Sequence, residues 1–110
     1  MIDNSQTIVT LVQTKPAANV ETAIYTVPST TRVLVGKIFL TNYANGAEKV
    51  TLWVCIGGAP TGVTNAVLFG YSIASGGYLL LEPFVTLNAG DVIRAKTDGD
   101  IAITILGNVI

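Results

Sequence analysis

Short apolar segments separated by turn-forming residues recur along this chain about every 8–12 residues. Apolar and polar side chains alternate within each segment, which is the pattern of a β-strand with one buried face. No stretch keeps apolar residues at helical spacing for more than a turn or two. This succession of strands and turns is typical of an all-β sandwich or barrel, and we predict a single antiparallel β-sandwich with about eight short strands.

The strongest turn signal is Asn45-Gly46, between the apolar segments 33–43 and 49–56. Asn and Gly tolerate the positive φ angles that a two-residue hairpin turn requires. We therefore predict a hairpin of these two segments at the centre of the sandwich, and a second hairpin at Asp98-Gly99. The side chains expected in the core from the central hairpin are Leu34, Ile38, Leu40, Val50, Leu52, Val54 and Ile56.

Residues 21–110 hold most of the predicted strands, and we assign them to the β-sandwich domain. Residues 1–20 contain one short alternating segment, 5–13, followed by a loop around Pro16. This region is either the first strand of the domain or an arm that pairs elsewhere. Residues 1–6 lack the pattern of a secretory signal, and no apolar run reaches the ~18 residues of a membrane helix.

Charged residues make up 12% of the chain, about half of the usual ~25%, while 50% of the residues are hydrophobic. A domain of 110 residues has a large surface for so few charges, so we expect other subunits or another protein to cover part of it. The net charge of −1 and the scattered basic residues argue against nucleic-acid binding. The lone Cys55 allows no internal disulfide, which is consistent with folding in a reducing compartment.

The sequence lacks the usual equipment of an enzyme. Histidine is absent, so no Ser/His/Asp or Cys/His arrangement can form, and we predict neither a catalytic site nor a cofactor. Cys55 is expected to be a packed thiol rather than a reactive one. Asp98 and Asp100 fit a turn better than a Ca²⁺ site, and we predict no metal. The glutamates, at positions 21, 48 and 82, are isolated in sequence, although a glycosidase pair could still assemble in space.

Four aromatic residues allow two interpretations. Trp53, Tyr43, Tyr71 and Tyr78 could form a platform that stacks against sugars, or they could belong to the core or to a subunit interface. We favour the second interpretation. The residues predicted to form a capsid or subunit interface are Ile8, Val9, Leu11, Phe39, Tyr43 and Trp53.

Two stretches resemble small β-sandwich virion proteins of tailed bacteriophages. Residues 24–42 contain Tyr-Thr-Val-Pro, a turn, and an apolar strand that ends in Thr-Asn. Residues 87–94 contain a Leu-Asn-Ala-Gly-Asp turn, and the closing strand 101–110 follows. Together the two stretches frame residues 21–110. The pattern resembles capsid decoration (cement) proteins and head fibres most, and tail or baseplate modules share it.

The resemblance implies a jelly-roll-like sandwich, often trimeric, on the outside of a capsid. The expected function is that of a cement protein, which binds the major capsid protein as a homotrimer and is made in the cytoplasm of the bacterial host. Strand pairing by residues 1–20 would contribute to that binding. The alternative is a receptor- or glycan-binding module of a tail fibre or baseplate. Neither alternative implies nucleic acid or a membrane.

Overall fold

The computed structural model describes residues 8–110, and this part of the chain contains nine β-strands. The strands are β1 (Val9–Thr14), β2 (Thr22–Thr26), β3 (Arg32–Asn42), β4 (Glu48–Cys55), β5 (Ala66–Ile73), β6 (Tyr78–Leu81), β7 (Val85–Asn88), β8 (Val92–Thr97) and β9 (Ile101–Val109). A 3₁₀ turn, η2 (Ile56–Gly58), follows β4. Alternation and turn residues in the sequence also predict short strands at 78–81 and 92–97, and β6 and β8 have these bounds.

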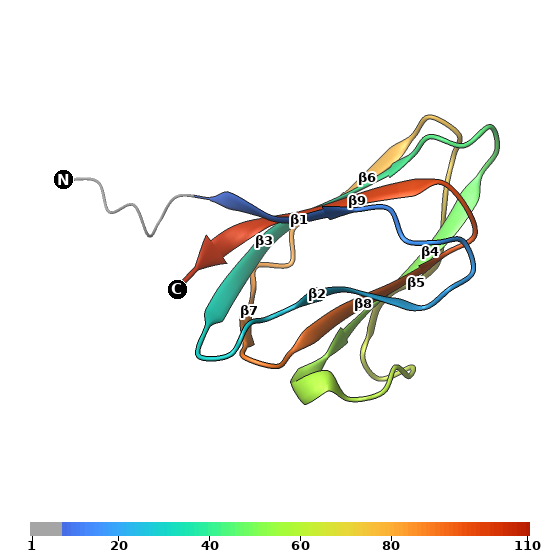
Figure 1. Ribbon diagram of the computed structural model, residues 1–110. Helices are drawn as coiled ribbons and strands as arrows, with labels where there is room; N and C mark the ends of the chain where they lie inside the picture. The colour runs from blue at the N-terminus through green and yellow to red at the C-terminus, as the bar shows by residue number, and fades with distance from the viewer. Residues whose placement is uncertain (1–7) are drawn as a thin grey trace.

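The strands form two antiparallel sheets that face each other across the core (Figure 1). Sheet A has the order β1-β9-β3, and β6 and β7 pair with different halves of β3 on its other side. Sheet B has the order β2-β8-β4-β5. Only the β4–β5 and β6–β7 connections stay within one sheet, and every other connection between these strands crosses to the opposite sheet. This topology is that of a jelly roll, which confirms the predicted fold class.

The hairpin predicted at Asn45-Gly46 is wrong. β3 belongs to sheet A and β4 to sheet B, and the two strands are not paired with each other. Neither Asn45 nor Gly46 has the positive φ angle that a two-residue hairpin needs. The segment 43–47 instead carries the chain from one sheet to the other.

Asn42, the last residue of β3, gives the physical reason. Its side chain is fully buried, and its Nδ2 donates to the carbonyl oxygens of Gly46 at 2.9 Å and Ile73 at 2.8 Å. Its Oδ1 accepts the N–H of Ala44 at 2.8 Å. One buried amide therefore serves two backbone groups of the crossing and one at the end of β5, and leaving such groups unpaired in the interior would cost free energy.

The hairpin predicted at Asp98-Gly99 is wrong for the same reason, because β8 lies in sheet B and β9 in sheet A. The crossing is held by the Thr97 hydroxyl, which donates to the Gly99 carbonyl oxygen at 3.0 Å. The Asp98 N–H donates to the Lys49 carbonyl oxygen, also at 3.0 Å. Turn residues thus marked two real changes of direction but did not indicate which sheet the next strand joins.

β3 changes its buried face in mid-strand. Val33 and Val35 are buried in its first half, and Ile38 and Leu40 are buried in its second half. Two buried sets that are out of step by one residue require a bulge, and the register of β3 against β9 shifts between Val35 and Lys37. The bulge lets both halves of this long strand contribute to one core.

The bulge also corrects the predicted core. Leu34 was expected in the core because it is in step with Ile38 and Leu40. The bulge between Val35 and Lys37 breaks that alternation, so Leu34 lies on the outer face of sheet A. The backbones of β3 and β9 approach closely here. A Cβ added at Gly107 would overlap the carbonyl oxygen of Leu34, whereas one added at Gly36 would lie 3.7 Å from the Leu106 carbonyl oxygen.

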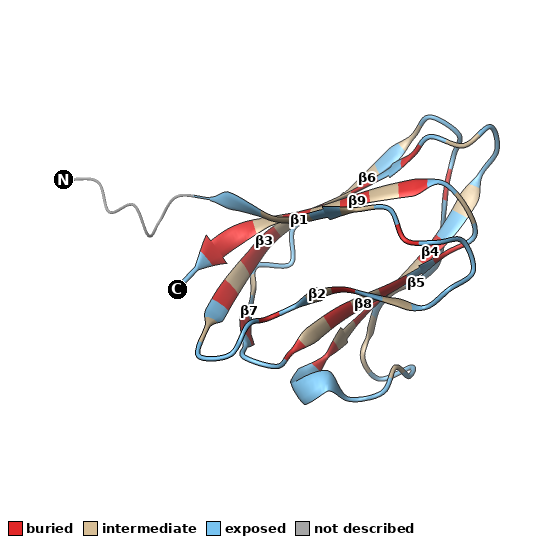
Figure 2. Ribbon diagram, in the orientation of Figure 1, coloured by how far each residue is buried: buried red, intermediate tan, exposed pale blue. Residues whose placement is uncertain are grey.

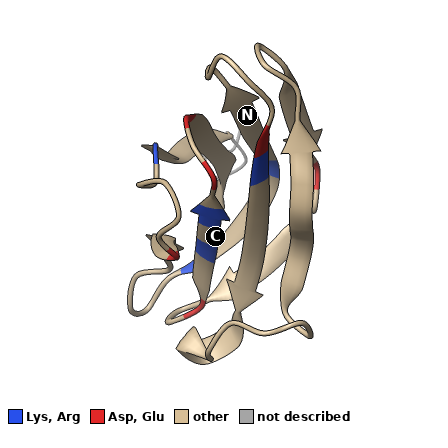
Figure 3. Ribbon diagram, turned by 90° about the vertical axis from the view of Figure 1, so that its right-hand side faces the viewer, with Lys and Arg blue, Asp and Glu red and all other residues tan. Residues whose placement is uncertain are grey.

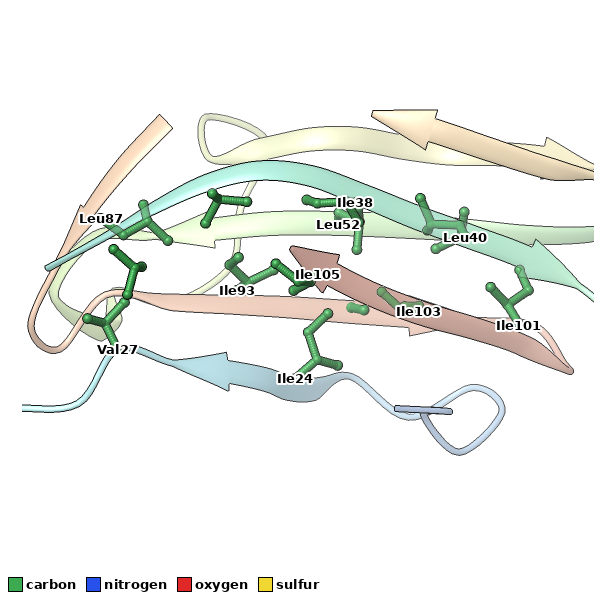
Figure 4. Close-up of a cluster of buried hydrophobic side chains, with 14 of the residues drawn as sticks. Ile24, Val27, Ile38, Leu40, Leu52, Leu87, Ile93, Ile101, Ile103 and Ile105 are labelled. Carbon is green, nitrogen blue, oxygen red and sulfur yellow. The ribbon is translucent and has the colours of Figure 1, made fainter. Parts of the chain in front are cut away.

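The core between the sheets is aliphatic, and buried residues alternate with exposed and half-buried ones along the strands (Figures 2 and 4). Burial of each large side chain stabilises the fold by about 1.5–3 kcal/mol. The prediction is confirmed for Val50 and Leu52, and Val54 packs against the core half-buried. Ile56 was expected in the core but is 65% exposed, because β4 ends at Cys55 and η2 turns the chain away. The core side chains with no exposed surface are Val33, Val35, Leu40, Val50, Leu52, Leu87, Ala95, Ile101, Ile103 and Ile105.

Near the N-terminus, the structure places Val9–Thr14 in sheet A as β1, paired with β9. Leu11 and Val12 pack against the core. Of the two alternatives for residues 1–20, a strand of the domain therefore describes this segment. Residues 5–7 of the predicted strand lie outside the described residues.

Candidate functional site

The edges of the two sheets are the surface most relevant to partner binding. β1 lies on one edge of sheet A and β6 and β7 on the other, while β2 and β5 lie on the edges of sheet B. None of these five strands contains Lys, Arg, Asp or Glu. Soluble β-proteins commonly place charges on edge strands, because unpaired backbone N–H and C=O groups recruit other strands. The edges of this sandwich lack that protection.

In the described part of the chain, charged residues within strands occur only on strands that have neighbours on both sides, and long stretches of the ribbon in Figure 3 carry none. β9, which is also central, has no charged residue. The distribution therefore leaves every described edge apolar or neutral. The charged strand residues are Arg32 and Lys37 on β3, Glu48 and Lys49 on β4, and Arg94 and Lys96 on β8.

Irregular strand pairing still limits the unrestricted addition of further strands to these edges. The register shifts once in β1 and once in β2, and twice along β5, where Gly70 has a φ of +58°. β6 and β7 contain only four residues each. Bulged or short edges pair poorly with arbitrary strands. The combination of neutral side chains and irregular backbone is suited to a specific partner.

Exposed apolar side chains gather where β1 begins and β9 ends, and these segments lie side by side in Figure 1. We call Ile8, Val9, Val109 and Ile110 the terminal patch. Each is between 45% and 55% exposed. Val9 pairs with Gly107, which brings the start of β1 beside the last residues of the chain. Two of the predicted interface residues, Ile8 and Val9, belong to this patch.

A second group of exposed apolar side chains follows β5. Val67, Phe69 and Tyr71 are 55%, 74% and 45% exposed, and we call them the β5 patch. Isolated exposed apolar residues are normal, but several large ones on one uncharged edge strand mark a contact surface. Sequence reasoning missed this patch, because its position on an edge follows only from the strand order.

The other predicted interface residues are dispersed. Leu11 is half-buried against the core. Phe39 lies half-buried on the outer face of sheet A, where it pairs with Leu80 of β6 and Thr104 of β9. Tyr43 is 50% exposed in the crossing that follows β3. These residues do not form one surface with the terminal patch.

Trp53 is only 8% exposed, although it is not part of the core. It lies on the outer face of sheet B, where it pairs with Arg94 across the strand. Arg94 Nε donates to Glu21 Oε1 at 2.9 Å, and the Thr61 hydroxyl donates to Glu21 Oε2 at 3.0 Å. These bonds link the loop 56–65, through Thr61 and Glu21, to Arg94 on this face, and Trp53 offers little exposed surface to a partner or a sugar.

Cys55 has no exposed surface, and burial raises the pKa of its thiol. The Asn65 side chain donates to its Sγ at 3.8 Å. A thiolate is the reactive form, and burial disfavours it. This environment is that of a packed thiol.

The carboxylates do not gather into a metal site in the part of the chain that the structure describes. Residues 8–110 contain no group of three or more His, Cys, Asp or Glu placed to hold a metal ion. Asp100 Oδ1 lies 3.6 Å from Lys15 Nζ. Asp91 is buried, and its carboxylate accepts the N–H groups of Gly57 and Asn88, both at 2.8 Å. Asp91 therefore ties η2 to the β7–β8 turn.

No protein-family model matches the chain, and no curated protein matches its sequence. Among solved structures, the chain is similar to one titled "Structure of infectious bursal disease virus Gx strain", with a TM-score of 0.41 and 11% identity. The similarity covers 94% of this chain and 36% of that one, so the chain spans about a third of its length. The fold assignment rests on the strand order. Within residues 8–110, no helix is long and apolar enough to cross a bilayer.

Proposed function

We propose that this protein is a structural component of a bacteriophage particle that decorates the outer surface of the capsid as an oligomer. The observation that carries the proposal is the absence of charge from all five edge strands. Monomeric β-proteins protect such edges, and a subunit whose edges are covered in its assembly does not need to. The resemblance of residues 24–42 and 87–94 to phage virion proteins supports the same function.

The attachment site in this proposal is the free edge of β1. β9 occupies one side of β1, and its other side carries backbone N–H and C=O groups without a strand partner among residues 8–110. A strand of the major capsid protein adds there, and the terminal patch packs against apolar capsid side chains. Backbone hydrogen bonds supply affinity, and the apolar side chains supply specificity.

The oligomer in this proposal is a homotrimer. The β5 patch of one subunit packs against β2, the opposite edge of sheet B, in the next subunit. Three subunits held together present three β1 edges to the shell at once. Simultaneous attachment raises the overall affinity by about 10²–10⁴ without any new type of contact. A weak single attachment can therefore produce stable decoration.

The test is rebinding of purified protein to particles of the encoding phage that have been stripped of it. Val9→Lys places an ammonium group on the free edge of β1, where partner binding would desolvate it. We expect attachment to weaken at least about tenfold. Val63→Lys, in an exposed loop at 85% exposure, is the matched control and should attach normally. Equal attachment of the two variants would contradict the proposal.

Point substitution is preferable to deletion of residues 1–14. The sequence alone suggested that such a deletion would weaken attachment and leave the fold intact. Because Leu11 and Val12 pack against the core, the deletion would also remove a strand of sheet A. Light scattering provides an independent check, since a stable monomer at micromolar concentration would contradict the oligomer.

The glycan-binding alternative has less support from the structure. Trp53, its principal stacking residue, is buried, whereas Tyr43 and Tyr78 are exposed. A glycan array is the direct measurement, and saturable binding that is lost on Tyr78→Ala would favour this alternative. Absence of enzymatic activity stays a prediction, and turnover of a polysaccharide or peptidoglycan substrate would contradict it.

A further inference from the structure

A cavity of about 580 Å³ opens between the two sheets, on the side where the edge of β5 faces the edge formed by β6 and β7. On the opposite side, β1 and β2 approach each other, although they are not paired. In the connection between them, the Asn19 N–H donates to the Thr97 carbonyl oxygen at 2.6 Å. Small-molecule sites in proteins typically have volumes of about 300–1,000 Å³. The cavity falls within this range.

A break in the edge of sheet A forms one wall of the cavity. β6 ends at Leu81 and β7 begins at Val85, and both residues line the cavity. Between them, Pro83 has no N–H to donate to β3, and Phe84 has a φ of +47°. The chain leaves β3 here and returns to it, so the sheet edge does not close over the interior.

The floor and the opposite wall are also apolar. Ile38 and Ile93 belong to the core and point into the space between the sheets (Figure 4). Val54 adds to the floor, and Val67 lies at the opposite wall, on β5. Native cores contain few voids larger than a water molecule. Hydrocarbon that covers these apolar side chains would remove them from water, which favours binding in this open cavity.

Three polar residues line the cavity, and they restrict the type of ligand. The Asn65 amide is already used, because its Oδ1 accepts the Gly62 N–H at 2.9 Å and its Nδ2 donates to the Pro60 carbonyl oxygen at 3.0 Å. Thr64 offers a hydroxyl group. Glu82 is the one ionisable residue among those that line the cavity, and no Lys or Arg is among them. A carboxylate without a cation beside it repels carboxylate, phosphate and sulfate groups.

We propose that this cavity binds a small aliphatic molecule with an uncharged polar end. Its hydrocarbon lies over Ile38 and Ile93, and its hydroxyl donates to the Glu82 carboxylate. The proposal does not involve the free edge of β1, where the capsid would attach. Val67, however, belongs both to the cavity wall and to the β5 patch, so Val54→Phe, which lies outside that patch, separates ligand binding from oligomer formation.

Titration calorimetry of the full chain with 1-hexanol, 1-heptanol and 1-octanol tests the proposal. We expect saturable binding of one molecule per chain, with affinity rising about fourfold for each added methylene. Octanoate at neutral pH is the charged counterpart and should bind at least tenfold more weakly than 1-octanol. Glu82→Gln removes the repulsion and should bring the two affinities together.

Two substitutions block the cavity from different elements. Val67→Trp, at a residue 55% exposed on β5, and Val54→Phe, on the floor, should each weaken 1-octanol binding at least tenfold. Val20→Trp is the matched control, because Val20 is 52% exposed and does not line the cavity. Circular dichroism identifies any variant that fails to fold, and the exposed position of Val67 makes that variant the safer of the two.

Three results would overturn the inference. The first is the absence of a saturable binding heat with 1-octanol. The second is a 1-octanol affinity of the Val67→Trp and Val54→Phe variants equal to that of Val20→Trp. The third is equal binding of octanoate and 1-octanol by the unsubstituted protein. Failure of capsid attachment would leave alcohol binding unchanged. The two proposals are therefore distinguishable.

Discussion

Gly107→Ala should be among the most damaging single-methyl additions in this protein. Gly107 lies on β9, between Val9 of β1 and Val35 of β3, in the middle of sheet A. The added Cβ would overlap the carbonyl oxygen of Leu34, and backbone atoms cannot rotate away as a side chain can. The substitution must therefore push β3 and β9 apart at the bulge.

The expected loss follows from two contributions. Overpacking in a well-packed interior costs about 1–3 kcal/mol. Separation of the strands also loses about one ladder hydrogen bond, worth about 0.5–1.5 kcal/mol. We therefore expect the free energy of unfolding to fall by about 1.5–4.5 kcal/mol. A chain of 110 residues unfolds with an entropy of about 0.23 kcal/mol/K near its Tm, so the Tm should fall by about 7–20 °C.

Gly36→Ala is the matched control, because Gly36 lies in the same bulge on the facing strand. An added Cβ there meets the Leu106 carbonyl oxygen at 3.7 Å, an ordinary contact distance. Its φ angle is not in the left-handed region, so the change should stay within about 1 kcal/mol in either direction. Urea and thermal unfolding at one fixed protein concentration measure both variants. Equal stability of the two variants would refute this account of the bulge.

Three further predictions concern single side chains. Asn42→Ala removes the hydrogen-bond partner of two backbone groups in the β3–β4 crossing and of the Ile73 carbonyl oxygen, and it should reduce the free energy of unfolding by about 2–4 kcal/mol in urea titrations. Leu40→Ala should cost about 2–5 kcal/mol in the same assay, whereas Leu80→Ala, on the outer face of sheet A, should cost less than half as much. Cys55 should react with a thiol reagent at pH 8 only after denaturant is added, because burial raises its pKa. For the same reason, stability should fall as pH rises above the ordinary thiol pKa, where only the unfolded chain loses the proton.

The strands of this protein could be predicted largely from alternation. The bounds of β6 and β8 match, since each ends at a clear signal such as Glu82-Pro83 or Asp98-Gly99. The pairing could not be predicted in the same way. Asn-Gly and Asp-Gly favour turns through local backbone energetics, but the sheet that receives the next strand depends on contacts remote in sequence. The burial of Asn42 is such a contact, with Ile73 as a partner.

The interface assigned to Ile8 and Val9 stays a prediction. Both residues are exposed, Val9 as the first residue of β1 and Ile8 directly before it. Trp53 was selected for its aromatic ring, but it offers little exposed surface, and the polar contacts of Thr61, Glu21 and Arg94 link a loop to its face of the sheet. No local pattern reveals that link. The sequence alone could not predict the uncharged edges, because only the strand order shows which strands lie at the edge of a sheet.

The position of β9 has a consequence for how the chain acquires its structure. β9 is the last described strand in sequence, yet it sits between β1 and β3. On the ribosome, β1 and β3 emerge long before the strand that joins them and must wait without their common neighbour. β6 and β7 can already pair with one side of β3, but sheet A cannot be completed until β9 has been synthesised. Pairing between strands so remote in sequence is expected to make folding slow. During that interval β1 and one side of β3 lack their common neighbour, and a chaperone would encounter these unpaired apolar edges.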